Sequence, residues 1–504
     1  MQANYKKSAL VLGVLSALAF APIFILPAFM ISFALAFKIA DNLPSYKKVC
    51  AFGYWFGFAH FVIGLYWIGN ALLVDFVSFG WLYPITIMSI GAFFGLFAIP
   101  SFIIWHFMRS GNLYVKVLSF ACVWVLAEWL RSFFLTGFPW NMLGTVFAFH
   151  DAYIQTASIW GTYGLSFIAV LLVGCVYAMF SNKISIGFTA LLGIIIALST
   201  FGFWRISTYD AVSSDIKIRM VQPSIPQSMK WKSSELESNF FEYVNLSKKE
   251  GLEQVDFVIW GETALPFDIR YRSEYKEFIK DAIPDNGYLV TGVVRFEVFD
   301  NYYSPYNSMY VIDKNADIVN FYDKNHLVPF GEYIPFRKHL PNWVRPITNN
   351  IADFATSEKF KNIKLNNYPD FGGLICYEII FPDNVVNRNA KPKWLVVLTN
   401  DGWYGKSSGP YQHLVAAQMR AVEEGITIVR SANSGISAIV SPMGQILNKI
   451  DLHEKGYLDV FLPKNIEINT LYSHIGSTGI VLSVVLILCF LILLDYRHFR
   501  KSTK

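Results

Sequence analysis

The sequence predicts a multi-pass α-helical membrane domain of about eight spans joined to an α/β domain outside the cytoplasm. The chain of 504 residues is 54% hydrophobic and only 16% charged, too apolar for a soluble protein of this length. Long apolar runs fill residues 1–204 and return at 474–494. A helix needs about 20 apolar residues to cross a bilayer, and no apolar run between 205 and 473 approaches that length.

The first apolar run, Ser8 to Phe37, would extend about 45 Å as one helix, too long for a hydrocarbon core of about 30 Å. Pro22 and Pro27 interrupt the run, so we expect two short, tilted spans. Its start imitates a secretory signal peptide, with Lys6 and Lys7 before the apolar run and the triplet AFA before Pro22. Because proline follows the triplet and the apolar run continues, we expect this segment to be retained.

Six further spans are expected. They are Ala51 to Ile68, Ile85 to Trp105, Val117 to Leu135, Ser158 to Phe180, Ile184 to Phe203 and Ile475 to Leu494. Basic residues fall between alternate spans, as the positive-inside rule requires of cytoplasmic loops. They include Lys38, Lys47, Arg109, Lys116, Lys183, Arg497 and Lys504.

This charge pattern predicts that both termini are cytoplasmic and that the α/β domain lies on the far side. The predicted order is a membrane domain of seven spans at 1–204, the α/β domain at 205–473, the eighth span at 474–494 and a basic cytoplasmic tail at 495–504. Within the spans, Glu128 and Arg131 are three residues apart and could pair on a helix, or contact lipid headgroups. We interpret His60 as a packed or interhelical polar residue.

Short β-rich runs recur through 205–473, interspersed with helical patterns, which is typical of an α/β domain. The predicted helices lie in SSELESNFFEYVNLSKKEG and in Tyr411 to Gly425. The predicted strands are Ile216 to Gln222, Asp256 to Glu262, Tyr288 to Val294, Ser308 to Asp313, Phe371 to Cys376, Trp394 to Asp401 and Gly425 to Ala432.

Cysteine usage argues against a disulfide framework, because four of the five cysteines lie in or beside apolar runs. Only Cys376 lies in the polar part of the chain. The sequence contains no nucleic-acid signature and no CxxC or HExxH motif, so we expect neither a nucleic-acid partner nor a metal.

Three predicted strands end in groups with catalytic potential, Glu262, Lys324 and Cys376. Together they could perform acyl transfer. Glu262 could take the thiol proton, while Lys324 and a backbone N–H after Cys376 could stabilise the oxyanion. A sharp turn after the strand would expose the thiol. Taken singly, a cysteine at such a position is more often a small core residue, and a glutamate or lysine such as Glu262 or Lys324 is more often a surface group.

Four segments, WGETALPF, YDKNHLVPFGEYIPF, ICYEIIFPD and LTNDGWYG, resemble the nitrilase superfamily, whose members carry a Glu-Lys-Cys triad. The apolar spans, LTGFPWN at Leu135 to Asn141 and VQPSIPQSMKW at Val221 to Trp231 extend the resemblance to the apolipoprotein N-acyltransferase family over nearly the whole chain. The resemblance implies an αββα sandwich for the α/β domain.

The resemblance also implies roles for individual residues. Glu262 would be the general base, Lys324 the oxyanion stabiliser and Cys376 the nucleophile. Supporting positions would be Glu332, Tyr377, Glu378 and, on a mobile arm, Trp231. One departure is Gly261, where the family commonly has proline before the base, so the rigidity of the turn that aims Glu262 is in question.

The implied reaction transfers an acyl chain from the sn-1 ester of a phospholipid to Cys376 and then to the α-amine of an apolipoprotein's diacylglyceryl-cysteine. The implied partners are the phospholipid donor, the diacylated acceptor and membrane lipids. We expect a monomer without a cofactor in the bacterial inner membrane, with a periplasmic catalytic domain. Two alternatives stay open: a membrane-tethered nitrilase-type amidase that hydrolyses small amides, and a transporter or receptor whose α/β domain only binds.

Overall fold

A computed structural model describes residues 4–108, 112–210, 212–299, 302–341, 346, 353–357, 361–464 and 467–502. Arg109 and Lys504, two of the basic residues that predict the membrane orientation, lie outside the described residues. The chain divides into two compact units. The helical unit comprises Met1–Gly69, Trp81–Tyr209 and Thr470–Lys504, and the α/β unit comprises Asn70–Gly80 and Asp210–Asn469.

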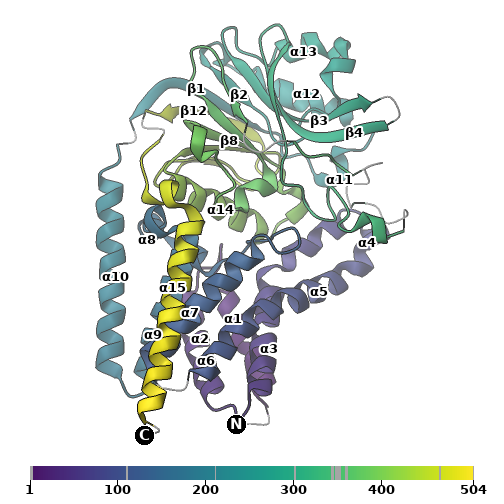
Figure 1. Cartoon of the computed structure of the whole chain (residues 1–504). Helices are drawn as coiled ribbons and strands as arrows, with labels where there is room; N and C mark the ends of the chain where they lie inside the picture. Colours follow the sequence, from purple (N-terminus) through teal and green to yellow (C-terminus); the bar gives the residue numbers. More distant parts are fainter. Residues whose placement is uncertain are drawn as a thin grey trace. The chain divides into compact units, whose positions relative to one another are not determined.

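The helical unit contains the apolar runs as helices (Figure 1). Its principal helices are α1 (Tyr5–Ala17), α2 (Leu26–Asp41), α3 (Tyr46–Gly64), α5 (Tyr83–Gly95), α6 (Ile99–Phe107), α7 (Leu113–Arg131), α9 (Ala157–Phe180), α10 (Ile184–Ser207) and α15 (Leu471–Ser502). The first run breaks between α1 and α2 as expected. Pro22 lies in the break, whereas Pro27 lies in the first turn of α2, where a missing N–H costs no helical hydrogen bond.

Among the described residues, five helices are long and apolar enough to cross a membrane, or six if the bent pair Tyr46–Gly64 and Tyr66–Leu73 is one span. Helices α1 and α2 have 13 and 16 residues and are shorter than these. A total of eight requires both short helices to cross, so that number stays a prediction. The multi-pass helical architecture itself is confirmed.

Polar groups inside the helical unit hold its segments together. His60 Nδ1 lies 2.8 Å from the Ser16 hydroxyl and joins α3 to α1, as its interpretation as an interhelical residue predicts. Glu128 accepts from the backbone N–H of Leu143 at 2.7 Å, and Arg131 donates to the carbonyl oxygen of Trp140, also at 2.7 Å. These two side chains therefore hold the segment after α7 against that helix.

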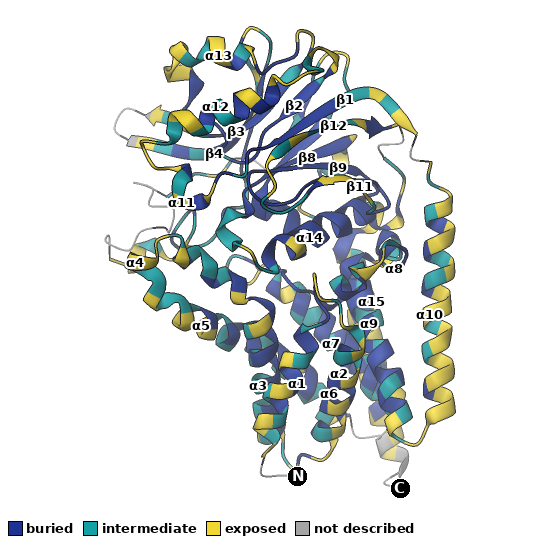
Figure 2. Ribbon diagram, turned by 180° about the vertical axis from the view of Figure 1, so that it is seen from behind, coloured by how far each residue is buried: buried dark blue, intermediate teal, exposed yellow. Residues whose placement is uncertain are grey.

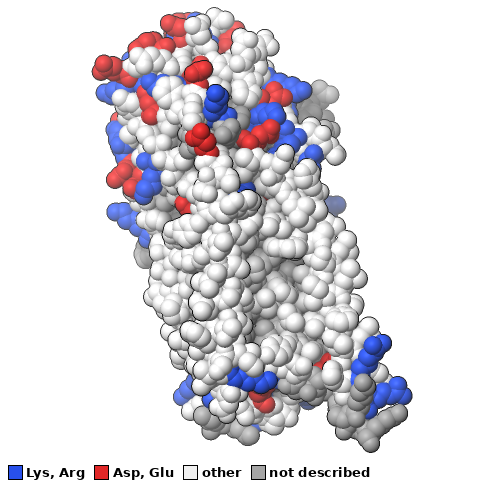
Figure 3. Space-filling view, turned by 90° about the vertical axis from the view of Figure 1, so that its left-hand side faces the viewer, with Lys and Arg blue, Asp and Glu red and all other residues white. Residues whose placement is uncertain are grey.

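The surface of the helical unit is suited to lipid. Figure 3 shows a broad face without charged side chains on the helices, with lysines and arginines gathered at one end. Helix α10 is exposed along most of its length (Figure 2), and its outward side chains include Ile186, Phe188 and Ile196. Apolar side chains on such a surface are stable in hydrocarbon and unstable in water.

Among the residues that the structure describes, the α/β unit contains two six-stranded sheets, which confirms the predicted fold class. The first sheet has the order β12-β1-β2-β3-β4-β5 and the second β11-β10-β9-β8-β7-β6. The central strands β1 to β3 and β7 to β9 are parallel, and the outer strands are antiparallel. The strands are β1 (Ser213–Gln222), β2 (Phe257–Ile259), β3 (Tyr288–Phe299), β4 (Tyr302–Ile312), β5 (Ile318–Asp323), β6 (Asn362–Ile363), β7 (Phe371–Ile375), β8 (Trp394–Thr399), β9 (Thr427–Ala432), β10 (Ser437–Val440), β11 (Ile446–Ile450) and β12 (Gly456–Pro463).

Apolar side chains of both sheets form one core between them, including Ile259 and Val290 from the first sheet and Ile375 and Val396 from the second. Helices α12 (Leu236–Ser247) and α13 (Lys276–Lys280) cover the outer face of the first sheet, and α14 (Gly409–Glu424) covers that of the second (Figure 1). This layering is the αββα sandwich. It brings the ends of β2, β5 and β7 to one place.

Candidate active site

Glu262 follows β2 after Trp260 and Gly261, and the turn that aims it is bonded to both sheets. The backbone N–H of Glu262 donates to the carbonyl oxygen of Thr399 at 3.4 Å, and the carbonyl oxygen of Gly261 accepts from the N–H of Gly292 at 3.2 Å. A Cβ at Gly261 would lie 2.9 Å from the backbone nitrogen of Asn433. The glycine therefore permits close approach of the two sheets, and hydrogen bonds hold the turn in place.

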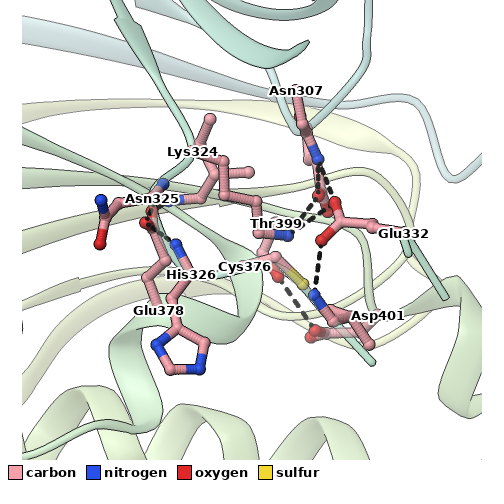
Figure 4. A network of polar contacts seen from close by, with 12 residues as sticks. Asn307, Lys324, Asn325, His326, Glu332, Cys376, Glu378, Thr399 and Asp401 are labelled. Carbon is pink, nitrogen blue, oxygen red and sulfur yellow. Dashed lines mark hydrogen bonds and ion pairs between the residues drawn. The ribbon is translucent and has the colours of Figure 1, made fainter. Parts of the chain in front are cut away.

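Lys324 directly follows β5 and is only 1% exposed. Its Nζ lies 2.9 Å from Glu332 Oε1 and 3.5 Å from Glu262 Oε1 (Figure 4). Asn307 on β4 donates from Nδ2 to both carboxylates, at 2.8 Å to Glu262 and 2.7 Å to Glu332. The other oxygen of Glu332 accepts from the N–H of Val328 at 2.8 Å. One ammonium and two carboxylates thus form a single buried cluster.

Cys376 is the first residue of η10 (Cys376–Ile380), directly after β7. Its φ of 52° lies in the left-handed region, which residues with a side chain rarely adopt. A strained residue between strand and helix is the geometry of a nucleophile elbow. The expectation that this turn exposes the thiol is wrong, because the core between the sheets and the neighbouring loops leave Cys376 only 6% exposed.

The charges around Cys376 define what the site can do. Burial raises the pKa of the thiol to about 12; Glu262 also raises it, and Lys324 lowers it. At neutral pH the sulfur therefore keeps its proton until a base removes it. Burial opposes the charge of Lys324, but Glu332 and then Glu262 hold the pKa of its ammonium above the usual value. The site combines a neutral thiol, a nearby carboxylate and a permanent cation.

Glu378 connects the lysine and the nucleophile. Its Oε1 accepts from the N–H groups of Asn325 and His326 at 2.8 and 3.1 Å and from the Tyr322 hydroxyl at 2.8 Å. Its Oε2 accepts from the N–H of Ile375 at 2.7 Å. Burial raises the pKa of this carboxyl, whereas these donors favour its charged form. Glu378 therefore holds the loop of Lys324 against the turn of Cys376.

The other two predicted residues are placed differently. Tyr377 is 3% exposed and packs its ring edge-on against Phe381 at 5.1 Å between centroids. Trp231 caps the short helix α11 (Gln227–Lys230) and is 44% exposed. Tyr377 is thus part of the packed wall behind the nucleophile, and Trp231 is a surface residue in this conformation.

The residue before Trp231 belongs to the site and was missed by the sequence reasoning. Lys230 is 5% exposed, and its Nζ donates to the backbone oxygen of Glu262 at 2.7 Å. Burial lowers its pKa to about 8, against the charges of Glu262 and Cys376. Asn307 was also missed. Lys230 and Asn307 take part in the site through contacts with residues distant in the chain, so only the tertiary structure identifies them.

Among the described residues, no group of three or more His, Cys, Asp or Glu side chains is arranged to hold a metal ion.

Two family models match the chain. Residues 12–175 match the apolipoprotein N-acyltransferase N-terminal domain, and residues 217–466 match the carbon-nitrogen hydrolase domain. Together they cover most of both structural units.

Curated relatives are similar over almost their whole length. An apolipoprotein N-acyltransferase of Rickettsia prowazekii is 37% identical over 97% of this chain and 97% of its own. One from Rhodopseudomonas palustris is 35% identical over 96% of this chain and 94% of its own. Among solved structures, a Nesterenkonia amidase from the nitrilase superfamily matches 50% of this chain and 93% of its own, with 18% identity and a TM-score of 0.37.

Proposed function

The chain belongs to the apolipoprotein N-acyltransferase family, and from this premise we propose that Cys376 carries an acyl chain from a phospholipid to the α-amine of a diacylated apolipoprotein. The observation that supports this most directly is the Lys324 ammonium, held by Glu332 and Glu262 beside a buried thiol at a strand end. Glu262, Lys324 and Cys376 are the catalytic residues of this proposal.

In the first half-reaction, Glu262 takes the thiol proton while Cys376 Sγ attacks the ester carbonyl carbon of the phospholipid. Lys324 and the backbone N–H after Cys376 stabilise the oxyanion. The ester C–O bond then breaks, Glu262 returns the proton to the leaving glycerol oxygen, and a lysophospholipid departs. Because the pKa of the thiol is raised to about 12, we propose that proton removal accompanies attack and that Glu262 is the general base.

In the second half-reaction, the neutral amine of the acceptor attacks the thioester carbonyl. Glu262 takes a proton from the nitrogen, the C–S bond breaks, and the proton returns to the Cys376 sulfur. The product is an amide, and the enzyme is restored. Glu332 keeps the ammonium of Lys324 in place through both steps, Tyr377 and Glu378 support the nucleophile turn, and Trp231 contacts arriving substrate.

The location follows from the substrates. Both are anchored in a bilayer, and the apolar helices support a membrane location, which we propose is the inner membrane. The termini are cytoplasmic and the catalytic domain, residues 205–473, is periplasmic. The protein works as a monomer without a cofactor.

The test is to incubate purified protein with phospholipid and measure its intact mass. Wild type should gain one acyl chain on Cys376 and pass it to a diacylated lipopeptide, whereas Cys376→Ala should gain none. Acylation that persists in Cys376→Ala would disprove the nucleophile assignment. Rapid hydrolysis of small amides without transfer to the peptide would favour the amidase alternative.

A further inference from the structure

A second buried polar cluster lies behind the nucleophile and has no part in the reaction described above. It consists of Asp401, which follows β8, His413 on α14 and Arg430 on β9, all at most 1% exposed. Asp401 Oδ1 lies 2.8 Å from His413 Nδ1, and Arg430 donates to Asp401 Oδ2 at 2.7 Å. Arg430 also donates to the carbonyl oxygen of Ile436 at 2.6 Å.

The other ring nitrogen of His413 reaches the nucleophile. Its Nε2 lies 3.1 Å from the backbone carbonyl oxygen of Cys376. Because a carbonyl oxygen only accepts, Nε2 carries a hydrogen and donates it. On the opposite side of the ring, Nδ1 faces Asp401 Oδ1 and Arg430. The distance from Nδ1 to Arg430 Nη2 is 3.0 Å. The imidazole ring is therefore held from both sides, and its orientation is determined by three strands and a helix that meet here.

The bond to Cys376 affects a peptide that the reaction uses. A peptide unit is planar and trans, so the orientation of the Cys376 carbonyl determines the orientation of the Tyr377 N–H on the opposite edge. This N–H is the first backbone group after Cys376 and thus a donor for the oxyanion in the proposed mechanism. If the peptide rotated, the Cys376 oxygen would lose its donor and the N–H would turn toward His413.

The backbone of Cys376 needs such support. With φ at 52° it is in a conformation that persists only where surrounding groups hold it. Glu378 holds the N–H of Ile375 before it, at 2.7 Å, and His413 holds the carbonyl after it. The first contact fixes the Leu374–Ile375 peptide, which is one peptide removed from the nucleophile, and the second fixes the Cys376–Tyr377 peptide directly after it.

We propose that His413, oriented by Asp401 and Arg430, is a positioning residue that locks the Cys376–Tyr377 peptide in the orientation required for acyl transfer. This inference rests on the proposed function and adds to it a residue that does not contact the substrate.

Two substitutions of His413 separate positioning from packing. In His413→Gln, the side-chain amide reaches about as far as Nε2 and can still donate to the Cys376 carbonyl. In His413→Asn, the shorter amide reaches only as far as Nδ1, so it can contact Asp401 but not Cys376. His339→Asn, at an exposed position, is the matched control.

The assay is single-turnover formation of the acyl-enzyme in micelles containing phosphatidylethanolamine and phosphatidylglycerol, followed by intact mass at a series of lipid concentrations. We expect His413→Asn to lower the maximal acylation rate by about 10- to 100-fold, the effect of leaving a buried acceptor without its donor. The lipid concentration at half-maximal rate should be unchanged. His413→Gln should recover most of the rate, and His339→Asn should match wild type.

The results distinguish the two proposals. If wild type acylates Cys376 and His413→Asn does so at the same rate, the positioning role is refuted while the proposed function stands. Equal losses in the Asn and Gln variants, in proportion to lower thermal stability, would also refute it, since they would indicate packing alone. If wild type forms no acyl-enzyme, the proposed function itself fails.

Discussion

Replacing Asn307 with aspartate tests the buried cluster most sharply. The two hydrogens of Asn307 Nδ2 go to Glu262 at 2.8 Å and Glu332 at 2.7 Å, so this amide is the donor that lets two carboxylates share one lysine. Aspartate has nearly the same shape but offers only acceptors. Asn307→Asp therefore puts a third carboxylate beside two others around a single ammonium.

The magnitude follows from these contacts. A hydrogen bond to a charged group contributes about 1.5–3 kcal/mol, so the loss of both costs about 3–6 kcal/mol. The buried cluster recovers part of this cost by binding an extra proton, because like charges raise the pKa of neighbouring carboxyls. If about 3 kcal/mol remains in the acylation barrier, the rate at neutral pH falls by about 100-fold. Since Glu262 must be unprotonated to act as a base, the rate of Asn307→Asp should rise more steeply with pH than that of wild type.

The assay is single-turnover acylation of Cys376 between pH 6 and 9, with circular dichroism and thermal unfolding to verify the fold. Asn315→Asp adds the same charge in the exposed turn between β4 and β5 and should change the rate little. A folded Asn307→Asp variant that acylates within threefold of wild type at pH 7 would refute this account of the cluster.

Two further predictions concern the turn of Glu262. Gly261→Ala should destabilise the α/β unit by about 1–3 kcal/mol in thermal unfolding, since its Cβ would lie 2.9 Å from backbone, whereas Gly456→Ala, with nothing within 4 Å, should have little effect; equal effects would contradict the close-approach argument. Lys230→Met should change how stability depends on pH. Because burial lowers the pKa of Lys230 to about 8 from 10.5, the native state binds fewer protons than the unfolded state between these values, so this lysine makes wild type more stable as pH rises through that window, by about 3 kcal/mol. Lys230→Met lacks this increment, and identical pH dependence of unfolding in both proteins would show that Lys230 is not a buried cation.

Much of the fold could be predicted because its signals are local. Apolar length predicted the membrane helices, β-rich runs predicted β1 to β4 and β7 to β9, and helical patterns predicted α12 and α14. The end of β5 was predicted at Lys324 but its range was not, and β6, β10, β11 and β12 were not predicted. β5, β6, β11 and β12 are the edge strands of the two sheets and are short or partly exposed, so their hydrophobic pattern is weak. β10 is buried inside its sheet but has only four residues, and β12 pairs with the distant strand β1.

The position at which a helix ends also depends on contacts that the sequence pattern does not reveal. The span predicted to continue to Leu135 ends at Arg131, because Glu128 and Arg131 bind the segment that follows α7. These bonds join residues 9 and 15 positions apart, beyond the reach of helical periodicity. The chain remains apolar past Arg131, so composition alone gives no sign of the turn.

By itself, the sequence determined that this protein has a membrane part and an α/β part, and it identified Glu262, Lys324 and Cys376 as strand-end groups with complementary chemistry. Apolar length, periodicity and residue type suffice for such statements, because each is a property of a short stretch of chain. Only the tertiary structure decided that Cys376 is buried with its pKa raised, that Asn307 joins the two carboxylates, and that Lys230 and His413 reach the backbone of the base and the nucleophile. The physical reason is that burial and hydrogen bonding depend on which distant segments meet, and here the ends of two sheets and a covering helix meet around one thiol.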